Sequence, residues 1–323
     1  MHFASEELSE TEVIKTNLER AVASRKHLST SENEIFRLTH AEGDMLPGLI
    51  IDSYKNHLVI QCYSWGMYRL RKFISQCLLE LLPDTISIYD KSKESLHSDT
   101  IENEHLFGSA TDCIAKEHGI NYKIDWINGQ KTGFFIDQRN NRALLGSYAK
   151  GKSLLNTFCY SGGFSLAALQ NGATKVASLD SSADAIAILE NNLSLNHFEG
   201  EHESIVSDTL DYLKNADISQ YDIVVLDPPA YSKNRNTRHK AVQAYKRLNA
   251  MTIKKMKKGA LLFTFSCSQV VDKALFYNTI VAAGIESQRQ LKVLHQLHQP
   301  ECHPININHP EGEYLKGLVL QVE

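Results

Sequence analysis

The 323-residue sequence has no apolar run that approaches the roughly 18 residues needed to span a membrane. Residues 1–12 are acidic and polar and lack the apolar core of a secretion signal. The 6 cysteines lie far apart and form no C-x-x-C pair, so neither a zinc cluster nor a disulfide scaffold is expected. These absences predict a cytoplasmic protein that works without a metal and without a membrane. A homodimer is compatible with them.

Acidic residues are missing from one long stretch of the chain. Between Pro228 and Val271 there is no Asp or Glu, but there are 10 Lys or Arg. The net charge of the whole chain is only −4, so this excess of positive charge is local. Such a stretch is typical of a surface that contacts a nucleic-acid backbone. A solvated helix face is the alternative interpretation.

The order of strand-like and helix-like runs predicts two domains. Residues 1–117 indicate a small α+β domain that ends in a polar, acidic linker beginning at Lys93. Residues 118–323 form the second domain, which is expected to begin with a β-hairpin whose turn is Asn128-Gly129. From Ser153 onward short apolar strands alternate with helices. This alternation favours an α/β, Rossmann-like fold with a mostly parallel sheet and helices on both faces.

A cofactor site is expected at the carboxyl ends of the first strands, where ligands of open α/β sheets bind. The first strand leads into a turn with two adjacent glycines rather than G-x-G-x-x-G, so a dinucleotide phosphate cradle is poorly supported. The second strand ends at Asp180, placed for both ribose hydroxyls, and the third ends near Asp208, placed for an adenine edge. With no phosphate-binding lysine, this set indicates S-adenosylmethionine rather than ATP or NAD.

Either aspartate could instead cap the helix that follows it. The residues expected around the cofactor are Asn156, Phe158, Tyr160, Ser161, Gly162, Gly163, Asp180, Asp208, Asp227 and Pro228.

Two further strands end in reactive or polar residues. Asp227-Pro228-Pro229 follows the fourth strand, and Ser266-Cys267-Ser268 follows the fifth. The carboxylate and carbonyls of the rigid Asp-Pro-Pro turn can hold the exocyclic amine and ring nitrogen of a base. The alternative is that Asp227 only caps the next helix.

Cys267 suits nucleophilic chemistry on a pyrimidine. Carbon 5 of cytosine becomes nucleophilic only after a thiolate has added to carbon 6. A lone cysteine is more often inert packing, but this one lies at a strand end and shares a sheet edge with Asp227. A base inside an RNA helix must be flipped out, and Phe158, Tyr160 and Tyr231 could stack on it or belong to the core. The residues expected to contact the substrate are Pro229, Tyr231, Lys233, Arg235 and Arg238.

Several segments together resemble the bacterial large-subunit ribosomal RNA cytosine-C5 methyltransferase family, from about residue 13 to the end. They are Phe36-Arg37-Leu38, Glu42 to Asp52, Lys131 to Arg139, Asn156 to Phe164, Asp227-Pro228-Pro229, Ser266-Cys267-Ser268 and Pro310 to Gly317. The resemblance implies a class I methyltransferase fold, S-adenosylmethionine as methyl donor, ribosomal RNA as partner and Cys267 as nucleophile. It also implies that the following residues help to close the cofactor pocket: Lys131, Thr132, Gly133, Phe135, Asp137, Gln138 and Arg139.

The sequence departs from that family in two ways. Members usually begin with a small RNA-binding PUA domain, and this sequence starts too late to hold one, so RNA binding is expected to rely on residues 228–258 and the amino-terminal domain. Some RNA cytosine methyltransferases carry a second cysteine in the fourth-strand motif, where this chain has Pro229 and Ala230, so another group must remove the C5 proton. Two alternatives remain: a guanine-N7 or amino-nitrogen RNA methyltransferase that uses Asp227-Pro228-Pro229 alone, and a non-catalytic RNA-binding protein.

Overall fold

The computed structural model describes residues 9–232 and 234–323. Its contacts divide the chain into two compact units. One unit contains the chain up to Asp137 together with Pro300–Gly312, and the other contains Gln138–Gln299 together with Glu313–Glu323. The second unit therefore holds the cofactor and substrate residues that the sequence indicates beyond Asp137.

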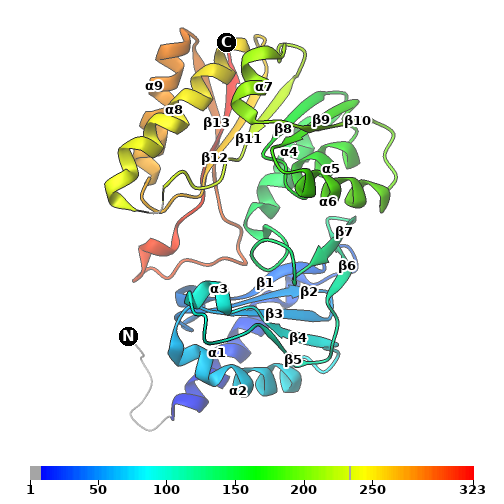
Figure 1. Cartoon of the computed structure of the whole chain (residues 1–323), viewed down its shortest axis with the longest axis vertical. Helices are drawn as coiled ribbons and strands as arrows, with labels where there is room; N and C mark the ends of the chain where they lie inside the picture. Colours follow the sequence, from blue (N-terminus) through cyan, green and yellow to red (C-terminus); the bar gives the residue numbers. More distant parts are fainter. Residues whose placement is uncertain (1–8, 233) are drawn as a thin grey trace. The chain divides into compact units, whose positions relative to one another are not determined.

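The first unit is built on a five-stranded sheet of order β1-β2-β3-β4-β5. All neighbouring pairs are antiparallel except β3 and β4, which are parallel. Helix α1 contacts β1, and α2 contacts both β3 and α1 (Figure 1). The elements are α1 (Glu10–Arg25), β1 (Ile35–His40), β2 (Leu49–Tyr54), β3 (His57–Cys62), α2 (Trp65–Leu81), β4 (Ser87–Asp90), α3 (Lys93–Leu96) and β5 (Glu104–Phe107), with 3-10 turns at Lys26–Leu28 and Ala41–Asp44.

The prediction of a linker at residues 93–117 is wrong. This stretch contains α3, the edge strand β5 of the five-stranded sheet, and the further strand β6 (Asp112–Glu117). Strand β5 pairs antiparallel with β4. Its polar side chains are compatible with an edge strand, because one side of such a strand faces solvent. A polar composition alone therefore does not distinguish a solvent-exposed edge strand such as β5 from a linker.

A β-hairpin is present, but the sequence placed its turn wrongly. Strand β6 pairs antiparallel with β7 (Ile120–Asp125) across His118-Gly119. Both turn residues have positive φ, +50° and +78°, which is the geometry of a type I′ two-residue turn. At the expected Asn128-Gly129 turn, the Asp125 carboxylate instead accepts hydrogen bonds from the Ile127 and Asn128 amides, both at 2.9 Å. That local Asx-type bonding ends β7.

The second unit is built on a seven-stranded sheet of order β10-β9-β8-β11-β12-β14-β13. The first five strands in this order are parallel, whereas β14 is antiparallel to both β12 and β13. The strands are β8 (Ser153–Thr157), β9 (Lys175–Asp180), β10 (Glu201–Val206), β11 (Ile223–Leu226), β12 (Leu261–Ser266), β13 (Leu291–His298) and β14 (Lys316–Val322). This topology confirms the predicted Rossmann-like α/β fold.

The helices of this unit are α4 (Arg139–Ala149), α5 (Gly163–Gln170), α6 (Ala183–Ser194), α7 (Thr209–Asn215), α8 (Arg238–Lys255) and α9 (Lys273–Ser287), with 3-10 turns at Ile136–Gln138, Arg235–Thr237 and Pro310–Gly312. Alternate residues of the central strands enter two different hydrophobic clusters. Leu155 and Val224 belong to one, and Leu154 and Val225 to the other. Because successive strand residues point to opposite faces, these clusters are the cores on the two sides of the sheet.

The chain leaves the second unit between its last two strands. After β13, residues 300–312 belong to the first unit, where Arg25 Nη2 donates to the Cys302 carbonyl at 3.3 Å and Asn306 Nδ2 donates to the Glu42 carbonyl at 3.1 Å. The chain then returns to form β14 between β12 and β13. The excursion was not predicted.

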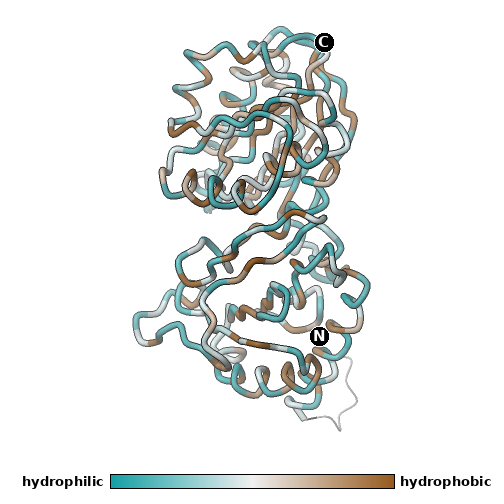
Figure 2. The backbone as a smooth tube through the Cα atoms, turned by 90° about the vertical axis from the view of Figure 1, so that its right-hand side faces the viewer, coloured by the Kyte–Doolittle hydropathy of each residue, from teal (hydrophilic) through white to brown (hydrophobic). Residues whose placement is uncertain are grey.

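Hydrophilic and hydrophobic residues alternate along many of the helices in Figure 2, as expected of helices with one packed and one solvated face, whereas α5 is buried from Gly163 to Leu169. Among the residues that the structure describes, no helix combines the length and the apolar character that crossing a bilayer requires.

Candidate active site

The predicted site residues of the second unit gather where the parallel strands end. Strand β8 is flanked by β9 on one side and β11 on the other, so the chain changes direction across the sheet at this point. Ligands of open α/β sheets bind in the crevice at such a switch point. Asp180 ends β9, Asp227 follows β11 and Cys267 follows β12, all at the same edge.

The loop after β8 is held by Asp180. The Tyr160 amide donates to Asp180 Oδ2 and the Ser182 amide donates to Oδ1, both at 3.0 Å. Tyr160 has a φ of +44° and Phe158 a φ of +56°, an uncommon conformation for residues other than glycine. Ser182, rather than Asp180, is the N-cap of α6, so the capping interpretation of Asp180 is wrong.

A carboxylate has about four lone-pair sites, so Asp180 retains acceptor capacity after these two bonds. Its half-buried side chain therefore fits the pair of ribose hydroxyls that S-adenosylmethionine presents.

Buried polar atoms without partners also fit a bound ligand. Asn156 is 1% exposed and donates from Nδ2 to Ser165 Oγ at 2.8 Å, but its Oδ1 has no hydrogen-bond partner among the described residues. The buried Nη1 of Arg139 also has none within that part of the chain. Buried polar groups of this kind normally have partners. The residues present thus offer an acceptor and a donor that a polar cofactor could satisfy.

The two adjacent glycines have a packing role in the structure, whereas their predicted place around the cofactor stays a prediction. Gly162 has a φ of +81°, and a Cβ atom there would lie 2.1 Å from Leu189 Cδ1 on α6. A Cβ atom on Gly163 would lie 2.8 Å from Arg142 Cδ on α4. The glycines thus allow α5 to begin in close contact with side chains of its neighbours.

Asp208 is the N-cap of α7, because its Oδ1 accepts a hydrogen bond from the Asp211 amide at 3.0 Å. The capping interpretation of this residue is therefore confirmed. Its side chain is exposed at the end of β10, so contact with an adenine edge stays a prediction.

Asp227 does not cap the next helix. Helix α8 has Thr237 as its N-cap residue, whereas Asp227 Oδ2 accepts a hydrogen bond from Gln138 Nε2 at 3.0 Å. Gln138 is only 3% exposed, and its Oε1 accepts from Asn141 Nδ2 at 2.7 Å. The start of α4 therefore fixes the carboxylate at the end of β11. Pro228 is buried and Pro229 exposed, so the turn presents its second proline outward.

Cys267 is half-buried, at the end of the strand next to the one that Asp227 follows. It packs partly against the hydrophobic cluster on one side of the sheet. Of the other cysteines only Cys113 is also half-buried; the remaining four are buried. The Cys267 side chain is thus neither fully buried in the core nor fully exposed to solvent.

The fold places the basic residues between Pro228 and Val271 in two separate regions, one at each end of α8. Helix α8 connects the carboxyl end of β11, where the candidate site lies, to the amino end of β12. Its two ends therefore lie at opposite ends of the parallel strands. The lysines near its far end make internal contacts: Lys257 pairs with Asp222 at 2.7 Å, and Lys255 donates to the Lys214 carbonyl at 2.6 Å. The expectation that the whole stretch serves RNA is therefore too broad.

At the near end, Arg235 and Arg238 are exposed and line a hollow of about 500 Å³ together with Gln269, Val270 and Asp272. This hollow adjoins the segment that follows Cys267. Lys233, the third basic residue expected to contact substrate, lies outside the described residues.

Two of the three aromatic candidates, Tyr231 and Phe158, pack partly against the core. Tyr231 packs against Tyr245 with ring centroids 4.8 Å apart, and Phe158 packs against the same hydrophobic cluster. Burial raises the pKa of the Tyr231 hydroxyl to about 12.

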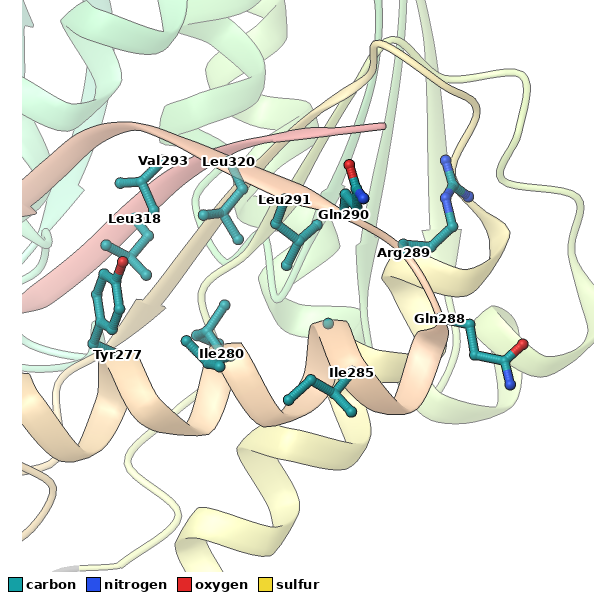
Figure 3. A pocket seen from close by; sticks show the side chains of 12 residues that line it. Tyr277, Ile280, Ile285, Gln288, Arg289, Gln290, Leu291, Val293, Leu318 and Leu320 are labelled. Carbon is teal, nitrogen blue, oxygen red and sulfur yellow. The ribbon is translucent and has the colours of Figure 1, made fainter.

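A second hollow, of about 330 Å³, lies between α9 and strands β13 and β14 (Figure 3), and none of the predicted site residues that the structure describes lines it. Within the described residues no His, Cys, Asp and Glu side chains form a group that could hold a metal ion.

Lys316, the first residue of β14, is not among the predicted site residues. This lysine is 5% exposed, and its Nζ donates to the carbonyls of Ser268 and Tyr314, both at 2.7 Å. Burial lowers its pKa to about 8. A lysine at the start of an apolar strand was the available signal.

The sheet is open and mostly parallel, Asp180 ends β9, and the Asp227-Pro228-Pro229 turn follows β11. Together these features define a class I methyltransferase architecture. Residues 98–310 match the family described as S-adenosylmethionine-dependent methyltransferase. The "Ribosomal RNA large subunit methyltransferase I" of Tolumonas auensis is 34% identical, over 99% of this chain and 83% of its own length. That of Alteromonas mediterranea is 37% identical, over 94% of this chain and 79% of its own length.

Among solved structures, SMU.776, a putative methyltransferase complexed with SAH, superposes with a TM-score of 0.87 and 24% identity, covering 98% of this chain and 83% of its own. The chain belongs to the S-adenosylmethionine-dependent methyltransferase family. It is therefore an enzyme whose cofactor is S-adenosylmethionine, and the non-catalytic alternative loses its support.

Proposed function

We propose that this enzyme methylates carbon 5 of a cytosine in large-subunit ribosomal RNA, in the cytoplasm, with Cys267 as its nucleophile. The choice of RNA rests on relatives at 34% and 37% identity whose names specify large-subunit ribosomal RNA. The choice of carbon 5 rests on one observation: a half-buried thiol follows β12, beside the strand that leads into Asp227-Pro228-Pro229.

The bound cofactor would supply an electrophilic methyl group. Asp180 would accept hydrogen bonds from its ribose hydroxyls. Asn156, whose Oδ1 has no hydrogen-bond partner among the described residues, lies on the neighbouring strand β8. Arg235 and Arg238, at the hollow next to the site, are placed to contact phosphates of the RNA.

The target cytosine would be held by Asp227, whose position is fixed by Gln138. The Cys267 thiolate then adds to carbon 6, which makes carbon 5 nucleophilic enough to accept a methyl group. Loss of the carbon 5 proton and expulsion of the thiolate restore the aromatic ring and the free enzyme.

The decisive experiment compares wild-type protein with Cys267→Ala on large-subunit ribosomal RNA. We expect the variant to bind S-adenosylmethionine by calorimetry with wild-type affinity and to produce no 5-methylcytidine by nucleoside mass spectrometry. Cys113→Ala is the matched control, because Cys113 is the other half-buried cysteine. RNA containing 5-fluorocytidine at the target should trap a covalent adduct with wild-type protein, since fluorine cannot leave as a proton does.

An active Cys267→Ala enzyme that yields a methylated guanine or a methylated amino nitrogen would replace the proposal with the nitrogen-directed alternative.

A further inference from the structure

The strand order brings a lysine next to the proposed nucleophile. Strand β14 lies antiparallel beside β12, with Lys316 paired in register to Ser266, the residue before Cys267. The Lys316 side chain reaches past this pair, because its Nζ donates to the carbonyl of Ser268, the residue after Cys267. The ammonium group is therefore bonded to the same three-residue turn that carries the thiol.

The positive charge of Lys316 is poorly compensated by its direct contacts. An ammonium group has three donors, and two of them meet the carbonyls of Ser268 and Tyr314. Within the described residues it makes no ion pair with a carboxylate. A buried charge that contacts only neutral dipoles is costly, so a nearby anion would stabilise it.

Three acidic groups act electrostatically on Lys316, and Cys267 has the largest effect of the three. The other two are engaged elsewhere: Asp272 caps α9 through the Leu275 amide, and Glu313 pairs with Lys273 at 3.7 Å. Burial alone would lower the pKa of Lys316, and the acidic groups oppose that effect. The thiolate of Cys267 is thus the anion best placed to accompany the ammonium group.

We propose that Lys316 is a positioning residue whose buried ammonium group favours the thiolate form of Cys267. The inference rests on the proposed role of Cys267 as the nucleophile. A thiolate, not a thiol, attacks carbon 6, and a neighbouring cation is a general means of increasing the thiolate population. Lys316 need not touch the RNA or the cofactor for this role.

The test is the pH profile of Cys267 alkylation by iodoacetamide, followed by peptide mass spectrometry on the full chain. Lys316→Met removes the charge and keeps an apolar stem of similar length. We expect it to slow alkylation of Cys267 at pH 7 at least tenfold, which corresponds to an upward shift of the profile by one pH unit or more. Lys316→Arg keeps the charge and should stay within about threefold of wild type.

Two internal references accompany these variants. Lys292→Met removes an exposed lysine of the neighbouring strand β13 and should leave the profile unchanged. Alkylation of Cys113, a thiol whose pKa burial raises to about 12, should be slow in every variant. A folded Lys316→Met protein with a wild-type Cys267 profile would overturn the proposal.

If Lys316→Met does not fold, the wild-type protein still tests the idea. The thiolate absorbance of wild type minus that of Cys267→Ala gives the pKa of Cys267 directly, and a value at or above the ordinary one of about 8.5 would overturn the proposal. Alkylation that depends on Lys316 without formation of 5-methylcytidine would leave this inference standing and remove the proposed reaction. Formation of 5-methylcytidine with alkylation independent of Lys316 would do the reverse.

Discussion

The hydrogen bond between Gln138 and Asp227 can be tested by replacing its donor with a second negative charge. In Gln138→Glu, a carboxylate oxygen would replace the Nε2 that now lies 3.0 Å from Asp227 Oδ2. Two unit charges about 3 Å apart repel by roughly 5 kcal/mol at an effective dielectric constant of about 20. The pair avoids this repulsion by keeping a proton, so the pKa of one carboxyl in the folded protein rises above its unfolded value of about 4.

The direction of the pH dependence follows from that rise. Above pH 4 the unfolded chain releases a proton that the folded variant retains, so the free energy of unfolding falls as the pH increases. We expect Gln138→Glu to lose about 3–4 kcal/mol relative to wild type at pH 7.5, and to recover most of it at pH 4.5.

Gln138→Met is the control, because it removes the hydrogen bonds of Gln138 with Asp227 and with Asn141 without adding a charge. We expect it to lose about 2–4 kcal/mol, and the same amount at either pH. Urea unfolding at both pH values, with wild type measured at each, provides the assay. A Gln138→Glu variant whose loss of stability, like that of Gln138→Met, is the same at both pH values would refute the close contact between Gln138 and Asp227.

Substitutions at Gly162 and at Asp208 separate roles that the structure combines, and Gly151 provides a control for the first. Gly162→Ala should destabilise the protein by about 2–5 kcal/mol in urea unfolding, because it adds both left-handed strain and a collision with Leu189. Gly151→Ala, which also has a positive φ (+70°) but open space around its Cβ position, should cost only about 1–2 kcal/mol, and an equal loss at both sites would exclude overpacking. Asp208→Ala should lose about 1 kcal/mol of stability through the cap, whereas Asp208→Asn retains the cap. If the residue contacts adenine, calorimetry should show weaker S-adenosylmethionine binding in the Asn variant, and unchanged binding would limit Asp208 to capping.

Local sequence patterns were sufficient to predict the structure where one physical signal dominated. The alternation of apolar strands and helices after Ser153 predicted the parallel sheet, because parallel strands need crossover helices. The residues at the strand ends were then placed at one edge by topology alone. The same local reasoning failed at Asn128-Gly129, where the Asp125 side chain formed a competing turn.

The sequence by itself determined the class of fold, the edge of the sheet that carries the site, and the chemical nature of Asp180, Asp227 and Cys267. Only the tertiary structure decided which of several polar residues meet. Gln138 lies 89 residues from Asp227, and Lys316 lies 48 residues from Ser268, yet each pair is hydrogen-bonded. Such contacts depend on the order and register of strands that are distant in the sequence, and no local pattern records which strands become neighbours.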